Sequence, residues 1–119
     1  MDVPAPRRRL GGRGHHRGDG LSLLFAADVP EDVAGVLTAT QRPVVTAAFT
    51  ETASAAAWRT KQSWALVAGA DRTISPEVQR FGAARVGVVV ELPRASHAVA
   101  LSEPTRVADL IRDGVRATI

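Results

Sequence analysis

The sequence predicts an α/β fold in which a helix connects two strands of a parallel sheet. Two short apolar runs, residues 63–69 and 86–92, have the length and composition of buried strands, and the second is rich in β-branched valine. Between them Ser75 and Pro76 suit an N-cap and a first helical position, which predicts a helix near residues 76–85. Continuously apolar strands joined through a helix are typical of parallel sheets that are covered on both faces.

Two further helices are expected on either side of this unit. The first starts at Pro30 with Asp28 as its cap, and Pro43 ends it. Its apolar residues follow helical spacing: Val33, Val36 and Leu37. The second starts at the Ser-Glu-Pro of residues 102–104, and it carries an apolar stripe of Val107, Leu110, Ile111 and Val115.

The remaining segments carry weaker signals. Val78 and Phe81 share one face of the helix predicted between the strands. Residues 44–58 contain small residues without a clean period, so we expect a loop there that includes at most a short helix. Two parallel strands have two open edges and too few helices to cover both faces, which predicts that this is the last part of a larger sheet.

Composition divides the chain at residue 20. Residues 1–20 contain five Arg and two Asp, whereas residues 21–119 contain ten basic and ten acidic residues, so the net charge of +3 belongs to the tail. We expect residues 1–20, rich in Arg, Gly and Pro, to be disordered. The adjacent His15 and His16 have no further ligands near them in the sequence, so no metal site is predicted.

The charge distribution and the composition also limit which partners the chain can bind. A neutral body lacks the basic face that binds phosphates, so nucleic acid is an unlikely partner. The chain has no cysteine, no apolar run of membrane-spanning length and no secretory leader, which predicts an intracellular, cytoplasmic protein without disulfides or membrane contact.

Two polar residues follow the predicted strands. Asp71 comes after the first strand and His97 after the second, and the carboxyl ends of parallel strands meet at one edge of a sheet. A carboxylate that accepts a hydrogen bond from one imidazole nitrogen fixes the tautomer and orientation of the ring and leaves the other nitrogen free to act as a base. Asp71 could instead close a turn, and His97 could be a hydrogen-bonded loop histidine; spacing alone does not decide between these interpretations.

The motifs around these two residues resemble a known family. The strand with "ADR" followed by "ISPEVQRF", and "SHAV" followed by Ser-Glu-Pro and a terminal helix, are similar to the C-terminal part of α/β-hydrolase fold proteins. The similarity is to the bacterial esterase-like branch related to plant methylesterases and hydroxynitrile lyases. It covers roughly residues 21–117, and "FAADVPEDVAGVLTATQRPV" looks like the end of the family's helical cap domain.

The resemblance implies a partial domain and a reaction. Residues 21–60 would be the end of the cap domain, and residues 61–119 the C-terminal β-α-β-α part of the sheet. Asp71 matches the acid and His97 the general base of a Ser-His-Asp triad. The family needs no metal or organic cofactor and uses a serine in a G-x-S-x-G turn, with an oxyanion hole of backbone N–H groups.

The chain departs from the family pattern at the nucleophile. None of its serines lies in a G-x-S-x-G motif; they are Ser22, Ser54, Ser63, Ser75, Ser96 and Ser102. The expected protein is therefore a truncated esterase-type hydrolase for small ester or acyl substrates, inactive alone. The alternatives are an interaction module that pairs with another chain, including a complementing N-terminal half, and a nucleic-acid-associated protein with a basic tail.

Overall fold

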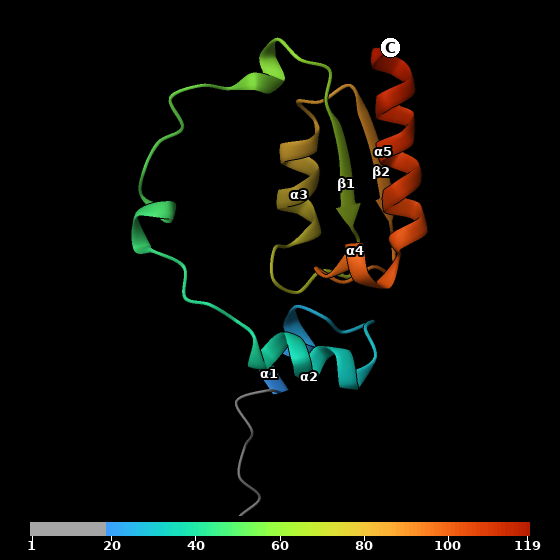
Figure 1. Ribbon diagram of the computed structural model, residues 1–119. Helices are drawn as coiled ribbons and strands as arrows, with labels where there is room; N and C mark the ends of the chain where they lie inside the picture. Colours follow the sequence, from blue (N-terminus) through green and yellow to red (C-terminus); the bar gives the residue numbers. More distant parts are fainter. Residues whose placement is uncertain (1–18) are drawn as a thin grey trace, which may run out of the picture.

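The computed structural model describes residues 19–119, and the expectations for the tail up to residue 18, including His15 and His16, lie outside that range. Two strands, their flanking helices and a separate helical pair make up the described part (Figure 1). In chain order the elements are α1 (Asp19–Leu24), α2 (Glu31–Ala39), the 3-10 helices η1 (Thr46–Phe49) and η2 (Ala57–Arg59), β1 (Trp64–Ala68), α3 (Pro76–Ala83), β2 (Val88–Leu92), α4 (Val99–Ser102) and α5 (Pro104–Thr118).

The sheet confirms the predicted β-α-β unit. β1 and β2 pair in parallel, with Trp64 opposite Val88 and Ala68 opposite Leu92. The Ser75 hydroxyl accepts a hydrogen bond from the Val78 N–H at 3.4 Å, which confirms it as the N-cap of α3. Figure 1 shows α3 and α5 on opposite faces of the sheet. The α1–α2 pair lies beyond the end to which both strands point, next to the loops that follow them.

The N-terminal part differs from the sequence expectation in two ways. α1 was not predicted, and because it begins at Asp19, residues 19 and 20 are helical rather than part of a disordered tail. Asp28 does not cap α2: Pro30 occupies the N-cap position, and no side chain caps the helix. Asp28 lies two residues before that position, and its carboxylate instead accepts hydrogen bonds from Ser96.

The segment between α2 and β1 agrees with the expected loop with short helical turns. It contains η1 and η2, and neither has a buried residue. In Figure 1 this stretch arches away from the sheet before returning to β1. The loop after β2 holds one unpredicted short helix, α4.

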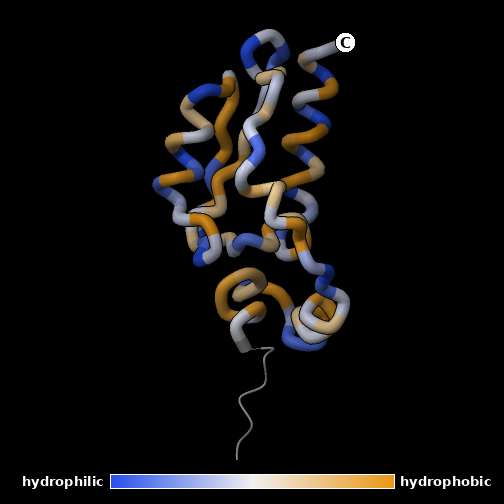
Figure 2. Tube along the Cα trace, turned by 90° about the vertical axis from the view of Figure 1, so that its left-hand side faces the viewer, coloured by the Kyte–Doolittle hydropathy of each residue, from blue (hydrophilic) through white to orange (hydrophobic). Residues whose placement is uncertain are grey.

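The core of the described residues is small because it is built mainly from alanine. The buried apolar residues are Ala26, Ala34, Val67, Ala68, Ala83, Ala95 and Ala98. Larger apolar side chains stay exposed on β2 and on α3, where Val78 and Phe81 are 60% and 69% exposed. Figure 2 shows apolar residues along the strands and in stripes on the flanking helices. The two-stranded sheet is therefore incomplete as a domain.

Within residues 19–119, no helix combines the length and the apolar composition that spanning a bilayer requires.

Candidate active site

The loops after β1 and β2 run side by side at the carboxyl end of the sheet. The N–H of Gly69 donates to the Leu92 carbonyl at 2.9 Å, and the N–H of Ala70 donates to the Ala95 carbonyl at 3.0 Å. A Cβ at residue 69 would lie 2.6 Å from the Pro93 Cα, so only glycine allows this approach. The contact brings the segment that carries Asp71 against the segment that carries His97.

Asp71 and His97 form a direct hydrogen bond. The distance between His97 Nδ1 and Asp71 Oδ2 is 2.7 Å. The Asp71 side chain is 2% exposed and that of His97 is 28% exposed. Because an ionised carboxylate only accepts hydrogen bonds, Nδ1 carries the proton, and in the neutral imidazole Nε2 is left with a lone pair. The predicted meeting of these two residues is confirmed, whereas their catalytic role stays a prediction.

The second oxygen of Asp71 closes the turn that follows β1. Oδ1 accepts hydrogen bonds from the N–H groups of Thr73 at 2.7 Å and Ile74 at 3.0 Å. The turn-forming interpretation and the histidine-orienting one therefore both hold, each through a different oxygen. Burial raises the pKa of Asp71, but the hydrogen bonds from His97, Ile74 and Thr73 outweigh this and hold the pKa below its ordinary value.

Gln79 is a further part of the site that the sequence did not reveal. Its Nε2 donates to Asp71 Oδ2 at 2.7 Å and to the Ile74 carbonyl at 2.8 Å, and its Oε1 accepts from the Ala68 N–H at 2.9 Å. A glutamine one turn after the Ser75 cap faces back toward the strand end, which is the only sequence signal for this role. Gln79 thus connects α3, β1 and the Asp71 carboxylate.

The segment before α2 contacts both loops. Thr73 Oγ1 donates to the Leu24 carbonyl at 2.8 Å, and the Ala98 N–H donates to the Phe25 carbonyl at 2.9 Å. The Phe25 ring lies against the His97 imidazole, with 4.6 Å between ring centroids and a tilt of 53°. Residues 24–28 therefore form one wall beside the imidazole.

A family model described as the alpha/beta hydrolase family matches residues 1–110. The chain belongs to the alpha/beta hydrolase family. The match includes Asp71 and His97, and it also takes in the first 20 residues, which the resemblance to the C-terminal part had left out. No curated protein and no solved structure matches the chain.

Three serines of this alpha/beta hydrolase make hydrogen bonds away from His97. Ser96 Oγ donates to Asp28 Oδ1, Ser63 Oγ donates to the Lys61 carbonyl, and Ser75 caps α3. Ser102 Oγ is buried. Within residues 19–119, which contain all six serines, none makes a hydrogen bond to His97, whose ring bonds only to Asp71.

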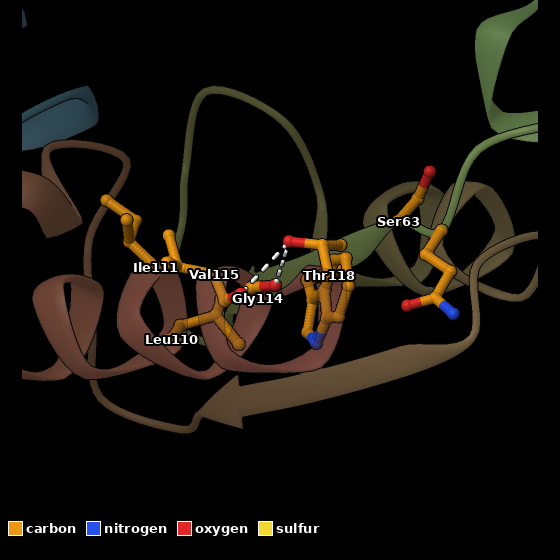
Figure 3. Close-up of a pocket in the computed structure, with 8 residues that line it drawn as sticks. Ser63, Leu110, Ile111, Gly114, Val115 and Thr118 are labelled. Carbon is orange, nitrogen blue, oxygen red and sulfur yellow. Dashed lines mark hydrogen bonds between the residues drawn. The ribbon is translucent and has the colours of Figure 1, made fainter.

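An apolar groove lies far from the Asp71–His97 pair. It has a volume of about 540 Å³ between α5 and the start of β1 (Figure 3). Its lining residues are Gln62, Ser63, Trp64, Leu110, Ile111, Gly114, Val115 and Thr118. Trp64 opens β1 whereas Asp71 lies beyond its last residue, so this groove is at the opposite end of the strand from Asp71 and His97.

In the described part of the chain, no three residues of the His, Asp or Glu type gather into a group that could hold a metal ion.

Proposed function

We propose that Asp71 and His97 are the acid and the general base of a serine-hydrolase triad that cleaves small ester or acyl substrates. The observation that carries this proposal is the 2.7 Å hydrogen bond between a buried carboxylate and a partly exposed imidazole. Four donors hold Asp71 ionised and in place, which is what an orienting acid requires. Membership of the alpha/beta hydrolase family supports the same roles.

In the proposed reaction His97 moves the protons and Asp71 stabilises its charged form. As a serine Oγ attacks the acyl carbon, His97 Nε2 takes the hydroxyl proton, and Asp71 stabilises the imidazolium that forms. The tetrahedral intermediate then expels the alkoxide, to which His97 returns the proton, leaving an acyl-serine. Water, deprotonated by the same nitrogen, hydrolyses the acyl-serine, and His97 finally protonates the serine.

The serine in this proposal comes from outside the 119 residues. All six serines of the chain lack a G-x-S-x-G context, and Ser96, the neighbour of His97, donates its hydroxyl to Asp28. The chain alone therefore turns over a chromogenic acetate ester no faster than buffer does. Turnover by the chain alone that disappears in His97→Ala would contradict this part of the proposal.

A chimera tests the roles of the two residues directly. The N-terminal part of an esterase of this family, including its serine turn and most of its cap domain, is fused to residues 21–119. We expect ester hydrolysis that falls by roughly 10³-fold or more in His97→Ala and in Asp71→Ala. Asp109→Ala, which removes an exposed carboxylate of α5, is the matched control and retains activity. An active chimera that is indifferent to His97→Ala would refute the assignment of the base.

A second candidate function is an interaction module, and the exposed apolar surface favours it. Val88 and Val89 of β2 are 42% and 48% exposed, and Ile111 of α5 is 61% exposed. Surfaces of this kind are typical of contact with another polypeptide. Light scattering after gel filtration tests this candidate: a well-folded monomer would argue against it, and a defined complex with a separately expressed N-terminal half would support it.

A further inference from the structure

The backbone on both sides of His97 is attached to one segment from the other end of the chain. The Ser96 N–H donates to Asp28 Oδ2 at 2.9 Å, and the Ala98 N–H donates to the Phe25 carbonyl at 2.9 Å. These contacts join residues that are about 70 positions apart, since Asp28 and Ser96 are separated by 68 residues. The residues before and after His97 are therefore both held by hydrogen bonds to residues 25–28.

Asp28 makes the stronger of the two attachments. Its second oxygen, Oδ1, accepts the hydroxyl of Ser96, a residue that is 2% exposed, and the same hydroxyl oxygen accepts from the Ala98 N–H at 3.3 Å. Loss of hydration raises the pKa of Asp28, but the hydrogen bonds from Ser96 outweigh it and the pKa lies below its ordinary value. Asp28 is therefore a charged acceptor at neutral pH, and charged hydrogen bonds are stronger than neutral ones.

The bond from Asp71 does not fix the imidazole by itself. One hydrogen bond at Nδ1 lets the ring turn when the backbone at residue 97 moves, because the bond that joins the two loops, from the Ala70 N–H to the Ala95 carbonyl, lies before His97. Asp28 holds the residue immediately before His97, and Phe25 packs against the ring face. Together they restrict the position from which Nδ1 reaches Asp71.

We propose that Asp28 is a positioning residue for His97: by binding both the N–H and the hydroxyl of Ser96, it keeps the imidazole in the orientation and tautomer that the Asp71 bond needs. The proposal rests on the proposed function for its catalytic meaning. The orientation and tautomer of the ring, however, can be measured without any reaction.

The test is the tautomer of His97 in the full 119-residue chain. Nitrogen-15 NMR through long-range couplings reports which ring nitrogen carries the proton, and His97→Gln identifies the His97 signals among those of the three histidines. In the unsubstituted chain we expect protonation at Nδ1. In Asp28→Asn we expect a roughly three- to tenfold rise in the population protonated at Nε2, the size of one lost hydrogen bond.

Two control variants separate positioning from general effects. Asp32→Asn removes the same charge from the exposed first turn of α2. Thr73→Val removes another contact with the α1–α2 pair, the hydrogen bond to the Leu24 carbonyl, without touching the His97 loop. Both should keep the tautomer of the unsubstituted chain. A folded Asp28→Asn chain with an unchanged tautomer would overturn the proposal, and so would an equal shift in Thr73→Val.

If Asp28→Asn does not fold by circular dichroism, Ser96→Ala takes its place. It removes only the hydroxyl and keeps the N–H bond to Asp28, so a smaller shift toward Nε2 is expected and an unchanged tautomer would overturn the proposal. These results do not depend on the proposed function. If the activity of the chimera does not change in His97→Ala, His97 is not the general base, but the effect of Asp28 on the tautomer can still hold. If the tautomer does not change in Asp28→Asn, Asp28 does not position the ring, but His97 can still be the base.

Discussion

The carboxyl end of the sheet and the faces of the same sheet are built in opposite ways. At the carboxyl end, Asp71 and Ser96 are 6% and 2% exposed and all their side-chain oxygens are hydrogen-bonded. On the faces, the β2 residues Val88 and Val89 are 42% and 48% exposed. Directed hydrogen bonds therefore hold the polar side chains of the candidate site, whereas the apolar faces of the sheet are only partly buried.

Removing the Asp71 carboxylate should have the largest effect of the changes that test this difference between the carboxyl end and the faces of the sheet. Asp71→Ala leaves the N–H groups of Thr73 and Ile74 and the Gln79 amide without their acceptor, so we expect a loss of about 3 kcal/mol in unfolding free energy. Denaturant unfolding followed by circular dichroism measures it. Asp109→Ala, whose carboxylate is exposed and paired only with Arg112, should cost less than about 1 kcal/mol. Equal losses would contradict the contrast.

Acid should weaken the carboxyl end before it affects the faces. Asp71 has a folded pKa below its ordinary value of 3.8, so its contribution to stability is present above that value and disappears as the pH falls through the folded pKa. Asp28 adds an effect of the same sign. Unfolding measured from about pH 6 to about pH 2 should show this loss, and Asp71→Asn should flatten the curve. If the stability of Asp71→Asn falls as steeply with pH, Asp71 is not the source of the pH dependence.

Changing the Gln79 amide to a carboxylate should have an intermediate effect. Gln79→Glu keeps an acceptor for the Ala68 N–H but loses both donors and places a second negative charge beside Asp71. We expect a cost of about 1–2 kcal/mol at neutral pH. Gln62→Glu, at an exposed loop position, is the matched control and should be nearly neutral. A neutral result for both variants would mean that the Gln79 bridge is dispensable.

The smallest effect is expected on the open face. Val89→Thr changes a 48% exposed side chain and should alter stability by less than about 0.5 kcal/mol in denaturant unfolding. The same exchange at Val67, which is 1% exposed, should cost about 1–2 kcal/mol because it buries a hydroxyl. If the two exchanges cost the same, the face of β2 is covered in solution.

Sequence reasoning succeeded where the signals are local or follow from strand direction. Ser75 with Pro76 gave the start of α3, and the parallel order of two valine-rich runs placed Asp71 beside His97. Both inferences need only neighbouring residues or the rule that parallel strands end together.

The residues that sequence reasoning missed act over long separations or through side-chain reach. Asp28 stands directly before a Pro-containing helix start, so local rules favour a cap, but its partner Ser96 is 68 residues away. Gln79 lies inside α3 and has no apolar or capping signal. Only the docking of α1–α2 and the packing of α3 on β1 reveal these contacts.

The Gln79 bridge also decides how far the sheet can extend. The backbone N–H and C=O groups of successive residues in a parallel strand point alternately to its two neighbours. The Gly69 N–H points to β2, so the backbone groups of Val67 and Ala65 do so too. The backbone groups of the other β1 residues point to the open edge of the sheet: Trp64, Leu66 and Ala68. Gln79 Oε1 already takes the Ala68 N–H. A strand added to this edge can therefore pair with the first part of β1 but not with Ala68. The Gln79 side chain occupies that position and keeps an incoming backbone away from the Asp71 turn.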